Sequence, residues 1–278
     1  MNARVRQPPF GSVSVWVGRH EVGVFYLLLL GLSWPYLFLT ADAGDSPARM
    51  VPLVLVGPSV CAFLIAYVAR GGAGVRALGR RVLLWRAPWW VYPLLFLGLP
   101  LCFMGAAYAV AAVLFPGQAT APSTGILITA AANVAAVFVL AGLGEEFGWR
   151  GLALPKLQER WGPLVASALV GLMWSVWHFP LGVGSPGWFA DNAVFLVSVT
   201  AATFFYTWLF NRTGGSILPV ALLHTMENIL GWPYQEVFSF EPPGFVFFDA
   251  VKAAVWVLVA VVAVLATRGL LGLRSARG

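Results

Sequence analysis

Long apolar runs, separated by short polar segments, dominate the pattern of this chain. A helix that crosses a bilayer needs roughly 20 mainly apolar residues, and about eight stretches approach that length. They are Val22–Thr40, Val51–Ala69, Trp89–Phe115, Ile126–Gly148, Gly162–Leu181, Asn192–Phe210, Ser216–Gly231 and Val246–Ala266. The pattern therefore predicts an all-α, polytopic membrane protein with about eight transmembrane helices.

Two of these stretches differ from a simple span. The first follows three arginines and ends near Ala41-Asp42-Ala43, which resembles a signal-peptide cleavage site. Its apolar part is longer than the roughly 7–15 residues usual for a signal peptide, so we expect an uncleaved first span. The seventh is short and follows Thr213-Gly214-Gly215, which favours a tilted or partly re-entrant helix.

The composition agrees with a membrane protein and excludes several other classes. Hydrophobic residues make up 60% of the chain and charged residues 10%, whereas about 25% is charged in a typical soluble domain. The mean hydropathy is +0.82. Nucleotide-binding loops and nucleic-acid modules are not evident. The two cysteines, Cys61 and Cys102, lie inside apolar runs and are expected to be small core residues.

The distribution of basic residues predicts the orientation in the membrane. Cytoplasmic loops of membrane proteins carry an excess of Lys and Arg. With eight spans and a cytoplasmic N-terminus, 15 of the 17 Lys and Arg fall on the inner side, and Arg49 and Lys252 are the exceptions. We therefore expect an integral protein of a bacterial-type plasma membrane with both termini cytoplasmic. The Arg70–Arg86 loop either lies on the inner leaflet as an amphipathic helix or serves as a topology signal.

Candidate chemistry begins at Gly144–Arg150, where two adjacent carboxylates end the fourth apolar run. Ionisable groups at membrane depth are costly, and they mark functional sites or buried ion pairs. Residues four apart share a helix face, so Glu146 is expected to form an ion pair with Arg150. Glu145 points about 100° away and stays free to accept a proton. Alternatively, both glutamates lie in the cytoplasmic headgroup zone.

Two histidines also lie within apolar runs. His178 follows Trp174 by one helical turn, and His224 shares a helix face with Asn228. A lone intramembrane histidine is usually a hydrogen-bonding group between helices, but here two accompany a glutamate pair. At a rise of about 1.5 Å per residue, Glu145, His178, His224 and Asn228 can meet in one cavity that opens to the cytoplasm.

The ordered set Glu145-Glu146-x-x-x-Arg150, aromatic-x-x-x-His178 and His224-x-x-x-Asn228 resembles the CPBP family of intramembrane proteases. This family contains the CAAX prenyl endopeptidases and bacterial members linked to bacteriocin self-immunity or processing. The resemblance covers about Ala130 to Gly231. The second motif of the family commonly starts with Phe, and Trp174 holds that place here.

The resemblance implies a role for each motif residue. Glu145, with His178, would activate a water that attacks a peptide carbonyl, and His224 and Asn228 would stabilise the oxyanion. Glu146 would orient the site through Arg150. The family is often labelled a metalloprotease, and zinc held by Glu145, His178 and His224 would fit a His₂Glu set. The sequence leaves zinc open, and we favour metal-independent glutamate chemistry.

Three functions compete on these grounds. The first is an intramembrane endopeptidase acting on a membrane-associated, lipidated or CAAX-like peptide or protein. The second is a non-proteolytic scaffold or immunity protein that retains the fold, and the third is a proton-coupled transporter. Missing inverted repeats argue against the transporter. We expect three parts in the chain: N-terminal helices with the amphipathic loop at 1–125, a protease core at 126–245, and a last helix with a basic tail at 246–278.

Overall fold

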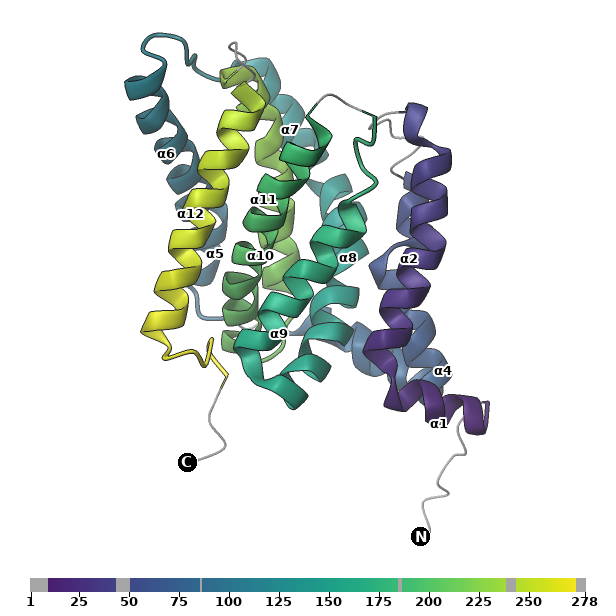
Figure 1. Ribbon diagram of the computed structural model, residues 1–278. Coiled ribbons are helices and arrows are strands. Elements are labelled where there is room, and N and C mark those ends of the chain that lie inside the picture. The colour runs from purple at the N-terminus through teal and green to yellow at the C-terminus, as the bar shows by residue number, and fades with distance from the viewer. Residues whose placement is uncertain (1–9, 44–50, 86, 185–186, 239–243, 274–278) are drawn as a thin grey trace.

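The computed structural model describes residues 10–43, 51–85, 87–184, 187–238 and 244–273, and every regular element within them is helical (Figure 1). The elements in chain order are α1 (Ser12–Arg19), α2 (Glu21–Leu39), η1 (Ala41–Ala43), η2 (Val54–Val56), α4 (Pro58–Gly79), η3 (Arg80–Leu83), α5 (Val91–Pro93), η4 (Leu94–Gly98), α6 (Leu99–Leu114), α7 (Thr124–Val137), η5 (Phe138–Leu143), α8 (Gly144–Glu146), η6 (Phe147–Ala153), α9 (Leu154–His178), α10 (Trp188–Arg212), α11 (Leu218–Val237) and α12 (Gly244–Ala266). The predicted all-α fold class is confirmed.

Six helical stretches of the described chain are long and apolar enough to cross a membrane. They are Glu21–Leu39, Val51–Leu83, Val91–Leu114, Thr124–His178, Trp188–Arg212 and Phe247–Ala266. The predicted fourth and fifth spans both lie in the fourth of these stretches. The predicted seventh span corresponds to α11, which runs past its predicted end at Gly231 to Val237. The fold is that of a polytopic membrane protein.

A sharp bend at Gly162 separates the two spans within Thr124–His178. Gly162 has φ 73° and ψ 173°, a conformation that glycine adopts without steric cost. Pro163 follows, and its missing N–H and fixed φ suit the first turn of the next helical segment. Gly162 and Pro163 therefore mark the end of one span and the beginning of the next, in agreement with the predicted start of the fifth span at Gly162.

The core of the bundle is built around α10, which packs against both α9 and α12 (Figure 1). Small and hydroxyl side chains let α9 and α10 approach closely, as is usual between membrane helices. Ser167 donates to Thr207 across this contact at 2.8 Å, and Gln158 exchanges hydrogen bonds with Asn211. In contrast, α7 packs mainly against α11, and most of its surface is exposed.

One end of the bundle collects the described basic segments. In Figure 1, α1, the last turns of α4 and the end of α12 lie at this end. The predicted amphipathic segment after Arg70 is helical through Leu83, with a kink at Gly71. Arg49 and Arg86, which entered the prediction of orientation, lie outside the described residues. The orientation of the termini relative to the cytoplasm stays a prediction.

Candidate active site

The two glutamates lie on a short α-helical turn between two π-helical segments. Helix α8 contains only Gly144, Glu145 and Glu146, with η5 before it and η6 after it. The sequence predicted a regular α-helix here, but π segments widen the helix and often occur at functional sites. The Oγ of Ser59 donates to the carbonyl of Leu143 at 2.6 Å, which gives a carbonyl of the irregular segment a partner.

Helix α4 approaches this segment closely at Gly148. A Cβ at position 148 would lie 2.6 Å from the Cβ of Pro58 and 2.7 Å from its carbonyl oxygen. Any side chain larger than hydrogen would push the start of α4 away. Glycine at this position therefore brings η2 and the start of α4 beside the carboxylates.

The predicted ion pair between Glu146 and Arg150 is confirmed. The Nη1 of Arg150 lies 2.9 Å and 3.1 Å from the two carboxylate oxygens, and neither side chain is exposed. The guanidinium lies over the rings of Trp174, at 4.5 Å, and Tyr206, at 4.3 Å. Its Nη2 donates to Thr203 at 3.4 Å. This cation neutralises one carboxylate in a setting that water does not reach.

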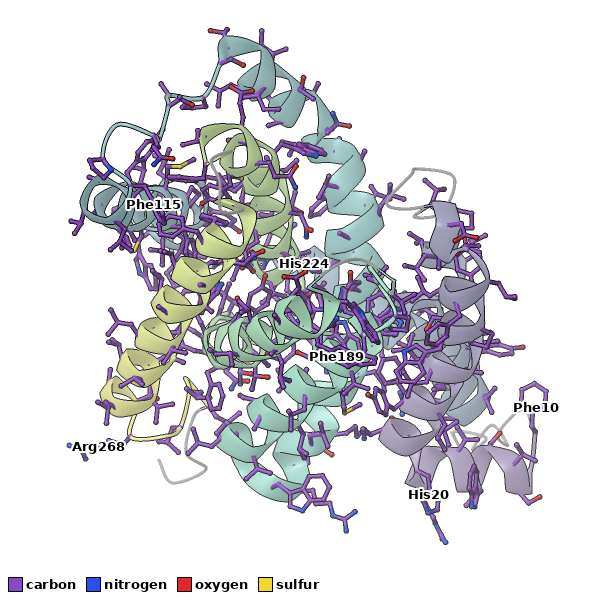
Figure 2. All side chains as sticks on the ribbon, turned by 45° about the horizontal axis from the view of Figure 1, so that its top comes forward. Phe10, His20, Phe115, Phe189, His224 and Arg268 are labelled. Atoms are coloured by element: carbon purple, nitrogen blue, oxygen red, sulfur yellow. The ribbon has the colours of Figure 1, made fainter. Side chains whose placement is uncertain are left out.

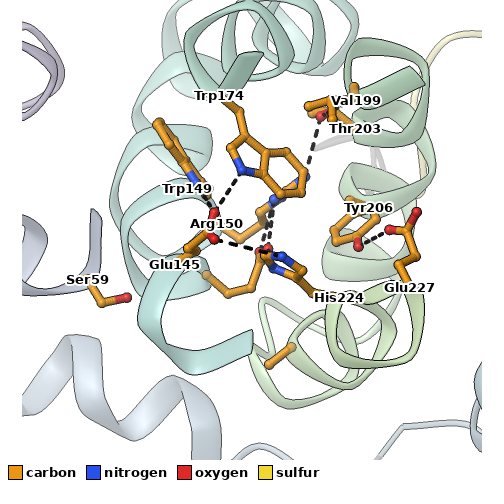
Figure 3. A network of polar contacts seen from close by, with 12 residues as sticks. Ser59, Glu145, Trp149, Arg150, Trp174, Val199, Thr203, Tyr206, His224 and Glu227 are labelled. Atoms are coloured by element: carbon orange, nitrogen blue, oxygen red, sulfur yellow. Dashed lines mark hydrogen bonds and ion pairs between the residues drawn. The ribbon is translucent and has the colours of Figure 1, made fainter. Parts of the chain in front are cut away.

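Glu145 has a different set of partners, as its position on the helix predicted. Its Oε2 accepts hydrogen bonds from the indole of Trp174 at 2.7 Å and the indole of Trp149 at 3.2 Å (Figure 3). An indole N–H can only donate, so Oε2 is the acceptor in both contacts. Its Oε1 lies 3.9 Å from the Nε2 of His224.

His224 connects the two carboxylates and lies in the middle of the bundle (Figure 2). Its Nδ1 is 3.0 Å from the Oε1 of Glu146. An ionised carboxylate only accepts hydrogen bonds, so Nδ1 carries a proton and donates. The other ring nitrogen, Nε2, faces Glu145. A carboxylate tied to Arg150 thus sets the orientation of the histidine beside Glu145.

His178 stands apart from this cluster. Its Nδ1 is 2.9 Å from the carbonyl oxygen of Trp174, and its ring packs against Trp177 and Phe195 at centroid distances of 4.5 Å and 4.9 Å. Among the described residues, no carboxylate lies within ion-pair distance of His178. The resemblance implied that His178 acts with Glu145 on a water, and a direct contact between these two side chains is not seen in the described structure.

Asn228 and Glu145 line a cavity of about 560 Å³. The amide of Asn228 donates to the carbonyl of His224 at 3.0 Å, one turn earlier. The cavity wall includes residues of η2, α7, η5 and α11, among them Val54, Val137, Leu140 and Trp232. We expected Glu145, His178, His224 and Asn228 to share one cavity. Glu145 and Asn228 line this one, and His178 and His224 are not among its lining residues.

Comparison with known proteins bears on the same segment. Residues 127–230 match a family model described as type II CAAX prenyl endopeptidase Rce1-like. This match agrees with the resemblance of the segment to the CPBP family. The segment is also similar to CAAX prenyl protease 2 of Methanococcus maripaludis, with 32% identity over 103 residues, or 34% of this chain and 37% of the relative. The aligned part thus spans about 37% of the length of that curated relative.

The candidate site residues do not form a zinc set in the described structure. Within the described residues, no three His, Cys, Asp or Glu side chains are grouped closely enough to hold a metal ion. Glu145, His178 and His224 therefore do not come together as the His₂Glu set that the sequence left open, and we derive no step through a metal.

The structure adds residues to the candidate site that the sequence analysis did not place there. Trp149 follows Glu145 by four residues, so the helix-face rule that paired Glu146 with Arg150 would have identified it. Tyr206 and Glu227 give no such signal. The hydroxyl of Tyr206 donates to Glu227, and the indole of Trp256 donates to the same carboxylate at 2.8 Å. These contacts join α10, α11 and α12 beside the ion pair.

Proposed function

We propose that this protein is an intramembrane endopeptidase in which Glu145 activates the water that hydrolyses a peptide bond. The environment of Glu145 carries the proposal. One oxygen is held by two indole donors, while the other faces His224 across 3.9 Å beside a cavity. That separation is too long for a direct hydrogen bond, but a water can bridge two polar atoms so placed.

The chain supplies both halves of an amide hydrolysis. Glu145 takes a proton from the water as the water oxygen attacks the carbonyl carbon, and the proton then passes to the departing amine nitrogen. The carbonyl oxygen becomes negative and needs donors. His224, with a proton on Nε2, and the amide of Asn228 are those donors in the proposal. Glu146 and Arg150 hold the ring of His224 and do not react.

The proposed substrate is a membrane-associated peptide or protein with a hydrophobic or lipidated part. The cavity at Glu145 is lined largely by apolar side chains, including Val54, Val137 and Leu140. Such a wall suits an apolar group better than a charged one. The name of the relative in Methanococcus maripaludis refers to a CAAX prenyl protein, so lipidated C-terminal peptides are the first class to try. We assign the reaction to residues 126–245.

The test is cleavage of a lipopeptide panel by purified protein reconstituted in liposomes. Glu145→Gln keeps the acceptor oxygen for the indoles and removes the base. A positioned base contributes about 10²–10⁴-fold to the rate, so turnover should fall by at least about 100-fold. Glu159→Gln is the matched control, because this carboxylate is exposed and lies outside the site.

Each outcome distinguishes between functions. Loss of turnover in Glu145→Gln with normal folding and full turnover in Glu159→Gln supports the proposal. Wild-type turnover that Glu145→Gln leaves unchanged refutes the assigned base. If no peptide is cleaved and both variants retain the biological activity of the wild type in cells, the non-proteolytic scaffold is the better account.

A further inference from the structure

A second cavity lies at the basic end of the bundle, between the α1–α2 junction and α9. Its volume is about 500 Å³, and it shares no lining residue with the cavity at Glu145. Its polar lining includes Arg19, His20, Lys156 and Arg160, and its apolar lining includes Leu169 and Met173. His20 lies at the edge of the molecule in Figure 2, next to α1. The cavity therefore combines cations at its mouth with an apolar interior.

The charges at the mouth are not balanced from within the described chain. Glu21 is the only carboxylate in the lining, and it forms an ion pair with Arg70. Lys156 has only the exposed Glu159, at 3.7 Å. For Arg19 and Arg160, none of the described carboxylates lies within ion-pair distance. A concave site lined by one sign of charge attracts the opposite sign, so the ligand is anionic.

The apolar interior follows from how α2 and α9 meet. At the end far from the cavity they are joined, because the indole of Trp177 donates to Ser33 at 2.7 Å and that of Trp34 donates to the carbonyl of Trp177 at 3.3 Å. At the other end, the cavity separates them. From Gly162 to Met173 the helix rises about 16 Å, close to half the roughly 30 Å thickness of the hydrocarbon core. An acyl chain of one leaflet fits this length.

Helix α1 places the mouth at the membrane surface. Val13, Val15 and Trp16 are each about half exposed, while Ser14 and Val17 on the other side are buried. A short helix with exposed apolar and aromatic side chains and a terminal arginine is typical of the bilayer interface. The cations of the cavity therefore lie at the depth of lipid headgroups.

We propose that this cavity binds one anionic glycerophospholipid of the surrounding leaflet. Its phosphate lies among Arg19, Lys156 and Arg160, and an acyl chain follows Leu169 and Met173. Met173 directly precedes Trp174, whose indole holds Glu145. The bound lipid fills the gap between α2 and α9, and α9 is the helix that carries Trp174.

The test is native mass spectrometry of the purified protein titrated with phosphatidylglycerol or phosphatidylcholine of the same chain length. The wild type should retain phosphatidylglycerol at least about 10-fold more tightly. Each cation near a lipid surface is worth about 1 kcal/mol, or about five-fold, so Arg19→Gln with Arg160→Gln should weaken binding about 30-fold. Arg76→Gln with Arg80→Gln is the control, because these two substitutions remove the same amount of charge from exposed positions outside the cavity. If the variant with Arg19→Gln and Arg160→Gln does not fold, Lys156→Gln is measured in its place.

A filling variant tests the apolar part separately. Leu169→Trp should reduce retention of phosphatidylglycerol without any change in charge. Equal binding of the two lipids to the wild type, or equal losses in the two arginine pairs, would overturn the proposal. Displacement of the lipid by glycerol phosphate at similar concentration would instead show a site for a soluble phosphate. Displacement by an acidic peptide would show a protein-binding surface, and either result would refute the lipid.

Discussion

The Nδ1 of His224 lies 3.0 Å from the Oε1 of Glu146, although 78 residues separate them in the chain. Glu146 also accepts two hydrogen bonds from Arg150, so one buried carboxylate holds a cation and a histidine together. This arrangement separates the two adjacent glutamates by role. Glu146 organises the site, and Glu145 faces the cavity.

Replacing Glu146 should therefore affect folding before chemistry. Glu146→Gln leaves the charge of Arg150 buried without a counter-charge, and removing one partner of a buried ion pair costs about 3–5 kcal/mol. The measurement is the unfolding free energy in detergent, with Glu159→Gln as the control. Adding Arg150→Met to Glu146→Gln should recover part of the loss, because it removes the uncompensated charge. Similar stabilities of Glu146→Gln and Glu159→Gln would contradict this account.

The hydrogen bond from the indole of Trp174 to Glu145 should contribute to stability. Trp174→Phe keeps an aromatic ring and removes the donor, and a hydrogen bond to a charged group is worth about 1.5–3 kcal/mol. Trp89→Phe, at an 80% exposed position, should change stability by less than about 0.5 kcal/mol. A double-mutant cycle with Glu145→Gln measures the coupling between the two groups. A coupling near zero would show that the contact does not contribute.

The two intramembrane histidines should differ in importance. His224→Ala removes a proposed oxyanion donor, and loss of such a donor costs about 10²–10³-fold in kcat. His178→Ala removes a ring whose Nδ1 is engaged with the carbonyl of Trp174, and we expect less than about a 10-fold loss. Steady-state kinetics on any cleaved peptide decide the matter. Equal losses would support the direct role of His178 that the sequence motif implied.

Glu227 should act as a positioning residue through Tyr206. In Glu227→Gln, one of the two carboxylate oxygens becomes an amide N–H₂, so either Tyr206 or Trp256 loses its acceptor. A buried donor left without an acceptor costs about 1–3 kcal/mol. The ring of Tyr206 covers Arg150, so kcat should fall while KM stays unchanged. Glu227→Asp, with a shorter carboxylate, should recover part of kcat. A loss of stability alone, without a change in kcat, would indicate a purely structural role.

The sequence identified the parts of this fold that depend on local patterns. Apolar run length predicted the helices, and the four-residue spacing predicted the ion pair of Glu146 with Arg150. The bend at Gly162 was also a local signal. The extension of α11 past Gly231 was missed because the apolar run is broken there by Pro233, Gln235 and Glu236, although Pro233 lies inside the helix.

Long-range geometry could not be predicted from local patterns. Whether His178 or His224 would face Glu145 depends on how α9 and α11 rotate about their axes, and packing of Trp174, Trp177 and Phe195 decides it. The π segments around α8 likewise depend on the approach of Pro58 to Gly148. The motif order selected the candidate residues, but only the tertiary structure shows which of them are in contact.

The exposure of α7 has a consequence for how a substrate arrives. Val137 and Leu140 of α7 and η5 line the cavity at Glu145, while Ile128 and Val139 are 63% and 56% exposed. A single layer of helix thus separates this cavity from the lipid on that side. If the proposed function holds, a substrate anchored in the bilayer would reach that wall by diffusion in two dimensions. Its encounter rate would then depend on the number of substrate molecules per lipid molecule and not on a concentration in water.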